Sequence, residues 1–456
     1  MSTIPKNYIS QPVNQSFTPP KTPPPECAQP IFHSWPEPET EPEQSPTIYQ
    51  EPSREFIVNH ITVEDDSFKL QNQEVLLLHR PKQRYEHTSD QPIPELQSES
   101  DMLVAVEAIG LNPIDWKAPD YGYGLPALPC ISGRDFAGTV VKPPRGTSRF
   151  GLGDKIMAIS TDYRDSKRSA FQQYALVSDF NACKLPDGVN TIEAAPLGVA
   201  FVAASIALGV CLGVNFSSVD RGPCGIDLLQ TVRSIPRDSL PPDIRTECFD
   251  GIRTQDRPKK GDWIAIWGAS SASGCCAVQL AKLAGLRVIA VIDVARSGER
   301  MLKHGADLLV DRFDTKRAVS IIQGVTKGRL RYGLDTVGKD SASHLSEAMQ
   351  KGDGKSSDTI HKDEVRKGHI VGLTGIPKQT GGQVGFHSVP IKLFHEVSTV
   401  GKGLMVWLEE LLRQKVLLTP DIEVAPGGLK GINSALDRLR DGSVNGPRLV
   451  VPLTTS

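Results

Sequence analysis

Apolar and polar positions follow two different rhythms along this chain of 456 residues. From residue 260 onward, apolar runs at 262–267 and 287–293 flank a segment, 277–283, whose apolar residues have helical spacing and which Gly285 ends. Further strands are expected at 307–311, 332–337 and 369–373, and further helices at 298–304, 315–325 and 342–349. Strands that alternate with helices predict a parallel, doubly wound sheet.

The first part of the chain has shorter apolar runs and more turn residues. Strands are expected at 74–79, 102–109, 155–160 and 171–177, with tight turns at 132–138 and 150–154. An Ala-rich stretch, 191–209, predicts a helix with Thr191 as its N-cap. Later segments predict helices at 404–412 and 432–439 and a closing strand at 448–452. We therefore expect an α/β protein with a β-rich domain ahead of the parallel sheet.

Two stretches fit neither rhythm. Residues 1–55 are rich in Pro, Glu, Ser, Thr and Gln, which favours a disordered tail, with a PxxP ligand for an SH3-type partner as the alternative. Residues 210–259 have little periodicity and are long for a connection inside a domain. We interpret them as a lid, a disordered insert, or sequence from a retained intron around 219–234.

Composition narrows the class of protein. Lys plus Arg total 51 and Asp plus Glu total 53, so bulk charge favours neither nucleic acid nor an anionic membrane. We expect no membrane span, because we find no apolar run of about 18 residues. The eight cysteines have no C-x-x-C spacing, which is typical of a reducing compartment and excludes a four-cysteine zinc site. With no apolar leader at the N-terminus, the expected location is cytoplasmic.

The turn between the 262–267 strand and the following helix carries the clearest chemistry. Every residue from 268 to 274 is Gly, Ala or Ser. Small side chains let a ligand approach the backbone, and a phosphate there would meet a helix N-terminus. We therefore predict a dinucleotide site, rather than a turn that merely packs a helix on a sheet. The candidate residues are Gly268, Ser270, Ser271, Ala272, Ser273 and Gly274.

Several motifs beyond this turn match a known family. They are Gly110-Leu-Asn-Pro-Ile-Asp-Trp-Lys117, Gly133-Arg-Asp-Phe-Ala-Gly138, Gly151-Leu-Gly-Asp154, Gly305-Ala-Asp307 and Asp335-Thr-Val-Gly338. Over 74–209 and 260–453 the chain resembles the medium-chain dehydrogenase/reductase superfamily. The resemblance implies a GroES-like β domain (56–200 and 410–456), a Rossmann domain (201–409) and a substrate cleft between them. It also implies cofactor contacts from Val337 and Gly338.

The positions that hold zinc in part of this superfamily differ here. Zinc members carry Cys where this chain has Asn112, and His-Glu where it has Arg134 and Asp135. No histidine occurs between His87 and His304, so we expect no imidazole near these positions and a protein without a metal. The chain thus resembles the zinc-free branch, which includes quinone reductases, mitochondrial enoyl thioester reductases and fungal enoyl reductases that act in trans.

Without a metal, a substrate carbonyl needs another donor. Tyr121 and Tyr123 lie in a segment that resembles the one carrying a tyrosine acid in enoyl thioester reductases, although either ring can equally be a surface tyrosine. Lys117 resembles the family lysine at the nicotinamide end of the cofactor, with a solvated lysine as the alternative. Asp115 and Trp116 either contact the cofactor or only fold the motif.

The residues after the second strand bear on the choice of cofactor. Asp293 lies 19 positions after Gly274, where an acid usually bonds the ribose 2′-hydroxyl and favours NAD(H). Arg296 and Arg300 follow closely and can bind a 2′-phosphate. Because the zinc-free branch mostly uses NADPH, we favour NADP(H) over NAD(H).

The leading hypothesis is a zinc-independent reductase that transfers a hydride from NAD(P)H to an activated C=C bond. Its substrate would be an enone or an enoyl thioester carried by CoA or a carrier protein. One alternative is an NADPH quinone oxidoreductase, and a second is a non-catalytic member that binds the cofactor. A homodimer is left open, and no nucleic-acid or membrane partner is expected.

Overall fold

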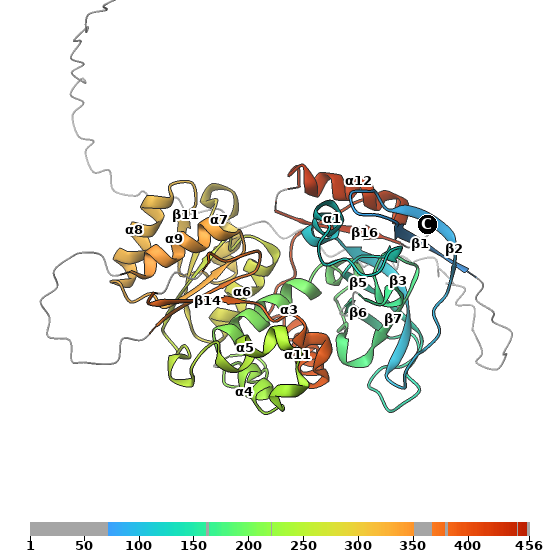
Figure 1. Cartoon of the computed structure of the whole chain (residues 1–456), viewed down its shortest axis with the longest axis horizontal. Helices are drawn as coiled ribbons and strands as arrows, with labels where there is room; N and C mark the ends of the chain where they lie inside the picture. Colours follow the sequence, from blue (N-terminus) through green and yellow to red (C-terminus); the bar gives the residue numbers. More distant parts are fainter. Residues whose placement is uncertain are drawn as a thin grey trace, which may run out of the picture. The chain divides into compact units, whose positions relative to one another are not determined.

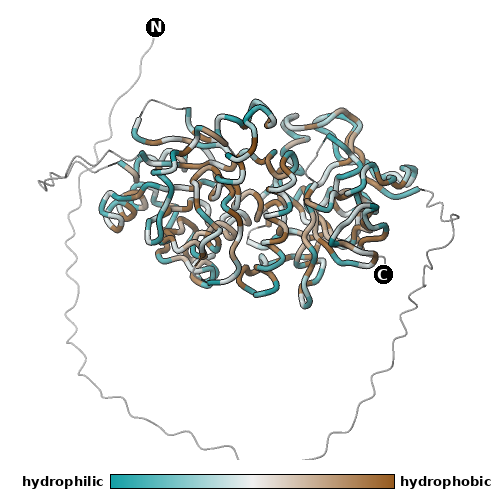
Figure 2. The backbone as a smooth tube through the Cα atoms, turned by 90° about the horizontal axis from the view of Figure 1, so that it is seen from below, coloured by the Kyte–Doolittle hydropathy of each residue, from teal (hydrophilic) through white to brown (hydrophobic). Residues whose placement is uncertain are grey.

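The computed structural model describes residues 72–160, 164–219, 221–350, 367–378, 382–444 and 446–453. The tail predicted at 1–55 lies outside these residues. Two sheets organise the described part of the chain (Figure 1). Figure 2 shows apolar stretches running through its interior, while hydrophilic stretches predominate in the outer turns.

The parallel sheet holds six strands in the order β11-β10-β9-β12-β13-β14. Their bounds are β9 (Trp263–Trp267), β10 (Arg287–Ile292), β11 (Leu308–Asp311), β12 (Tyr332–Asp335), β13 (Gly368–Gly372) and β14 (Val384–Ser388). All five pairings are parallel. This confirms the doubly wound sheet, although β14 was not predicted from the sequence.

Helices cover both faces of this sheet (Figure 1). They are α3 (Gly198–Ile206), α6 (Ala272–Leu283), α7 (Val294–Lys303), α8 (Thr315–Thr326) and α9 (Lys339–Met349). Ile264 and Ile266 of β9 pack in the core that contains α3 and α6, whereas Ala265 and Trp267 pack in the core with α8 and α9. A strand buried on both faces is continuously apolar, which is why the sequence indicated β9 so clearly.

The β-rich domain is built on a seven-stranded sheet and a three-stranded one. Its strands are β1 (Asn72–Leu78), β2 (Glu86–Pro92), β3 (Asp101–Gly110), β4 (Cys130–Ile131), β5 (Asp135–Lys142), β6 (Lys155–Ile159), β7 (Tyr174–Ser178), β8 (Ala182–Lys184), β15 (Ile422–Val424) and β16 (Arg448–Pro452). β16 pairs antiparallel with β3, and α12 (Gly428–Arg440) lies beside it (Figure 1). The C-terminal segment therefore returns to the first domain, as expected.

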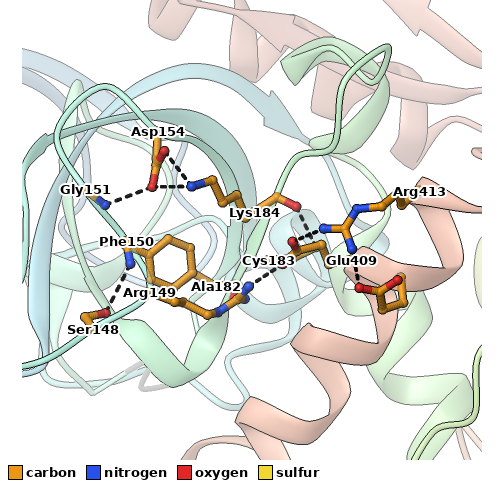
Figure 3. A network of polar contacts seen from close by, with 11 residues as sticks. Ser148, Arg149, Phe150, Gly151, Asp154, Ala182, Cys183, Lys184, Glu409 and Arg413 are labelled. Atoms are coloured by element: carbon orange, nitrogen blue, oxygen red, sulfur yellow. Dashed lines mark hydrogen bonds and ion pairs between the residues drawn. The ribbon is translucent and has the colours of Figure 1, made fainter.

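Helix α11 (Ser398–Arg413) joins the two regions by packing against β8 and α3. Figure 3 shows the polar contacts at this junction. The buried Glu409 is flanked by Arg149, from the loop before β6, and by Arg413, from its own helix. Arg149 also donates to the carbonyl of Ala182 at 2.8 Å. A buried carboxylate needs such partners, because desolvation of an unpaired charge is costly.

The stretch 210–259 contains packed helices, so the expectation of a disordered insert is wrong. A π-turn (Ala207–Cys211) leads to α4 (Leu228–Arg233) and α5 (Pro242–Asp250). Leu228, Leu229 and Val232 are buried in the same core as α6 and α11. Foreign sequence would not be expected to supply matched core residues, so this packing counts against a retained intron. The helices are short, which explains the weak periodicity.

Three local predictions also need correction. The turn expected at 132–138 ends early, because β5 begins at Asp135 and only Gly133 has a positive φ, +91°. The helix at 191–209 divides into α2 (Thr191–Ala194) and α3, and its N-cap is Asn190 rather than Thr191, since Asn190 Oδ1 accepts from Glu193 N at 2.9 Å. Helix α1 (Pro113–Tyr121) was not anticipated, because Pro113 and Pro119 obscure its pattern.

One helical stretch, Thr191–Cys211, is long and apolar enough to cross a membrane, contrary to the expectation that no such run exists. In the structure, 89% of its apolar window is buried inside the protein. Burial of this kind is typical of a core helix, which needs an apolar surface for the same physical reason as a membrane span.

Candidate functional site

The Gly-rich turn between β9 and α6 requires its two glycines. Gly268 has a φ of +75°, and a Cβ there would lie 2.3 Å from Thr336 Oγ1. A Cβ on Gly274 would lie 2.6 Å from the carbonyl oxygen of Gly268. Ser271 caps α6, since its Oγ accepts from Gly274 N at 3.1 Å. The turn is therefore a cradle that larger side chains would fill.

Residues after β12 hold this turn in place. Ser271 Oγ donates to Thr336 Oγ1 at 3.0 Å, and Thr336 Oγ1 donates to the Gly268 carbonyl at 2.9 Å. Asp335 Oδ1 accepts from the backbone N–H groups of Val337 and Gly338 at 2.9 and 2.7 Å. Burial raises the pKa of Asp335. The predicted contacts Val337 and Gly338 thus lie beside the cradle.

A cavity of about 730 Å³ opens against the cradle. The parallel-sheet side contributes the turn, Thr336 and the segment 372–375 at the end of β13. From the end of β14 onward it contributes Ser388, Val389, Ile391 and Phe394. The β-domain side contributes residues around Asn112, Arg134, Ser160 and Arg448, and α3 supplies an apolar wall. Ligands of open parallel sheets bind at the carboxyl ends of the strands, and this cavity occupies that position.

The cradle fits a dinucleotide. The turn carries only Gly, Ala and Ser side chains, so a ligand can approach its backbone, and α6 is long enough for its N-terminus to attract a pyrophosphate. Ser271, Ala272 and Ser273 line both the cradle and the cavity. A cofactor held at this turn would therefore extend into the cavity.

The three residues predicted to choose the cofactor have different surroundings. Asp293 caps α7, and its Oδ1 accepts from Arg296 N at 3.2 Å. Arg300 donates to the Ser270 carbonyl at 3.2 Å and pairs with Asp421 at 3.1 Å. The Arg300 guanidinium therefore braces the Gly-rich turn against the C-terminal segment. Its predicted phosphate contact would have to be made from this position.

A buried polar network occupies Asn112 and Asp135, two of the positions that the sequence resemblance matches to zinc ligands. Asn112 Nδ2 donates to Asp135 Oδ2 at 2.9 Å, and Asn112 Oδ1 accepts from Arg448 Nη2 at 2.8 Å. Asp115 Oδ2 accepts from Asn112 N at 2.7 Å, and Asp135 Oδ1 accepts from Val199 N at 2.8 Å. Burial raises the pKa of Asp115 to about 7 and that of Asp135 to about 6.

This donor set does not fit zinc. Both ends of the Asn112 amide are engaged, and the neighbouring cavity-lining groups are the guanidinium side chains of Arg134 and Arg448. A guanidinium cannot ligate a cation and would repel it. Within the described ranges, no group of three His, Cys, Asp or Glu side chains could hold a metal ion.

We expect the purified protein to contain zinc well below one atom per chain and to keep full turnover in a chelator. The reason is that Asn112 and Arg134 stand where zinc proteins carry Cys and His, and that Arg448 adds a second cation beside them. Elemental analysis together with rates measured with and without chelator tests this. Stoichiometric zinc that is lost in parallel with activity would contradict it.

Helix α1 and the turn after it carry the other predicted site residues, and these are not among the residues that line the cavity. Asp115 points into the buried network, while the centroid of the Trp116 ring lies 5.5 Å from Lys117 Nζ and 5.6 Å from Arg440 Cζ. Tyr121 and Tyr123 are 68% and 47% exposed. Lys117 and both tyrosines are absent from the cavity wall, although Pro113, Ile114 and Gly124 belong to it. Their catalytic roles stay predictions.

The cavity wall also contains groups that the sequence analysis missed. His395, on the short helix α10 (Leu393–Glu396) after β14, supplies an imidazole. Ser160, at the end of β6, has a buried Oγ with no partner among the described residues. The one sequence signal for His395 is that it follows the last parallel strand, because ligands bind at the edge of the sheet where the carboxyl ends of the strands meet. β14 was not predicted from the sequence, so this signal could not be used.

Comparisons with known proteins agree with this arrangement. Residues 98–187 match the alcohol dehydrogenase GroES-like domain family, and residues 272–357 match the zinc-binding dehydrogenase family. The trans-enoyl reductase FMN2 of Fusarium mangiferae is 29% identical over 363 residues, covering 77% of this chain and 92% of that protein. The trans-enoyl reductase BOA5 of Botryotinia fuckeliana is 28% identical over 379 residues, covering 80% and 95%.

Solved structures share the fold. The Escherichia coli quinone oxidoreductase complexed with NADPH superposes with a TM-score of 0.59 at 17% identity, covering 84% of this chain and 99% of that one. An alcohol dehydrogenase superfamily protein from Novosphingobium aromaticivorans gives a TM-score of 0.62 at 19% identity, covering 84% and 100%. The two domains, the dinucleotide cradle and these matches together show that the chain belongs to the medium-chain dehydrogenase/reductase superfamily of NAD(P)-dependent oxidoreductases.

Proposed function

We propose that this protein is a zinc-independent, NADPH-dependent reductase of carbon–carbon double bonds conjugated to a carbonyl, with enoyl thioesters as the leading substrate class. One observation carries the proposal: a largely apolar cavity meets the dinucleotide cradle at a wall whose donors do not suit zinc. The relatives named trans-enoyl reductases support the same choice of substrate.

Different residues would contact the cofactor and the substrate. The α6 N-terminus, with Ser271 and Ser273, would bind the pyrophosphate of the dinucleotide. A bound, reduced nicotinamide supplies a hydride to the β-carbon of the substrate. An apolar part of the cavity wall is formed by Ile159, Val199 and Val202. It would exclude water from the reacting bond and suits an acyl chain.

Charge that develops on the substrate carbonyl needs a hydrogen-bond donor. Ser160 Oγ is buried in the cavity wall and has no partner within the described part of the chain. An unpaired buried hydroxyl costs free energy that a ligand can recover by accepting its hydrogen bond. Ser160 is therefore the donor we assign to the carbonyl oxygen.

The proposal is tested by incubating the full chain with NADPH and three substrate panels: enoyl thioesters, simple enones and quinones. Oxidation of NADPH with a saturated acyl product, identified by mass spectrometry, supports the proposal. Turnover confined to quinones would make the protein a quinone oxidoreductase. Tight NADPH binding without turnover on any panel would favour the non-catalytic alternative.

We expect NADPH to bind more tightly than NADH, and Arg296→Ala to remove most of the difference. An arginine–phosphate contact contributes about 1.5–3 kcal/mol, which corresponds to roughly ten- to over a hundredfold in affinity. Calorimetric titration of both cofactors into the wild type and the variant measures this. Arg317→Ala, an exposed arginine on α8, is the matched control. A wild type that prefers NADH would show that Asp293 dominates.

A further inference from the structure

His395 differs in chemistry from every other described side chain that lines the cavity. The other polar members are serines, threonines, Asn112 and two arginines. Arginine stays protonated throughout the physiological range, and aliphatic hydroxyl and amide groups do not ionise there. Imidazole exchanges a proton near neutral pH. Among the described cavity-lining residues, His395 is therefore the one suited to act as a general acid.

The ring is held in place by its neighbours. The His395 side chain is 10% exposed, and its Nε2 lies 3.4 Å from Glu396 Oε1. The same carboxylate oxygen lies 3.4 Å from Arg164 Nη2, in the β domain. Glu396 therefore holds the imidazole through Nε2, on an element that lines the cavity.

The backbone of α10 is fixed as well. Asn181 Nδ2 donates to the Phe394 carbonyl at 3.0 Å. A Cβ on Gly401 would lie 2.7 Å from that carbonyl oxygen, so α11 approaches α10 closely because residue 401 is a glycine. Phe394 and Ile391 line the cavity beside His395. The imidazole therefore sits on a supported element of the wall rather than on a free loop.

The proposed reduction, on which this inference rests, requires one proton. Two electrons arrive as a hydride at the β-carbon, the C=C bond is consumed, and an enolate forms as the nicotinamide is oxidised. A proton must then add to the α-carbon to give the saturated thioester. We propose that His395 is the general acid that gives this proton and regains it from solvent, with Glu396 as its positioning residue.

The test uses crotonyl-CoA as the probe and the full chain. We expect His395→Gln to lower kcat by roughly 100- to 10,000-fold, while the affinity for NADPH changes less than threefold. His395→Asn is a second variant, in case glutamine disturbs packing. Glu396→Gln should shift the acid-donating limb of the pH–kcat profile with a smaller loss. His79→Gln, whose ring also faces a glutamate but lies outside the cavity, is the matched control and should keep the wild-type rate.

Three results would overturn the inference. The first is a wild-type rate in both His395 variants. The second is a loss confined to Tyr121→Phe or Tyr123→Phe, which would return proton donation to a tyrosine. The third is a wild-type kcat that does not change with pH between 5 and 9, measured under conditions in which protonation of the α-carbon limits the rate. A wild type that reduces no enoyl thioester or enone would instead refute the proposed function, and this inference with it.

Discussion

Ser271→Asp should lower the affinity for NADPH on the order of a hundredfold while the fold persists. Ser271 caps α6 by accepting from Gly274 N, and aspartate caps helices about as well as serine. The substitution therefore adds a negative charge where the pyrophosphate is expected without removing the cap. Two like charges about 4 Å apart repel by roughly 4 kcal/mol at an effective dielectric constant of 20, and solvent screening reduces this.

Ser271→Asn is the matched control, because asparagine also caps but carries no charge. Calorimetric titration of NADPH into wild type and both variants gives the affinities, and thermal unfolding without ligand reports the fold. We expect Ser271→Asn to bind within about tenfold of the wild type and Ser271→Asp to bind far more weakly. Equal affinities for the two variants would remove the cofactor from this turn.

The second large effect concerns a buried pair of histidines away from the cofactor cradle. His369 Nδ1 lies 2.9 Å from His387 Nε2, and His387 Nδ1 lies 2.7 Å from Glu247 Oε1. Only one of the two facing ring nitrogens can carry a proton, so both rings cannot be fully protonated together. Burial, followed by the charge of His387, lowers the pKa of His369 to about 4. The other charged groups that act on His369 are Asp256, Lys367 and Arg253.

Acidification should therefore destabilise the protein through His369. The unfolded chain binds a proton at His369 below pH 6.5, whereas the folded chain resists protonation until about pH 4. The contribution of His369 to the free energy of unfolding is complete above pH 6.5 and is lost as the pH falls toward 4. A depression of this size corresponds to roughly 3 kcal/mol.

His369→Asn isolates this contribution, because the amide can replace the contact made by Nδ1. Urea unfolding at pH 7.5 and pH 4.5 should show a smaller acid-dependent loss in the variant than in the wild type. Asp115 and Asp135, whose raised pKa values act in the opposite direction, are common to both proteins and cancel. His79→Asn, at an exposed histidine, should follow the wild type. A loss that is equal in His369→Asn and the wild type would contradict the assignment.

The sequence predicted the parallel sheet and its cradle because their signals are local. β9 is apolar throughout since both of its faces are buried, and the turn consists of small residues since the backbone there is crowded. α1 escaped prediction because Pro113 and Pro119 usually mark the ends of helices, although Pro113 occupies the permitted first turn. α4 and α5 escaped because each is short and its burial depends on distant partners.

The cavity wall was harder to predict from the sequence for a different reason. His395 follows a strand that gave no sequence signal, and its approach to the cavity depends on how that strand joins the sheet. Ser160 is one serine among many until the fold buries its hydroxyl, which has no partner among the described residues. The tyrosines were chosen by resemblance in a segment whose exposure the sequence could not reveal. The Gly-rich cradle is thus encoded locally, whereas the cavity wall is assembled from remote segments.

The pairing of β16 with β3 has a consequence for the order of events during synthesis. One edge of β3 pairs with β5, and its other edge is shared by β7 and β16. Val450 lies opposite Gly110, so the pairing along this edge of β3 can be completed only after residue 450 has been synthesised. Residues 263–388, which hold the parallel sheet, emerge earlier. Synthesis of the β domain therefore begins first, and its folding is completed last. Until β16 pairs with β3, unpaired backbone groups of β3 are exposed and can cause aggregation.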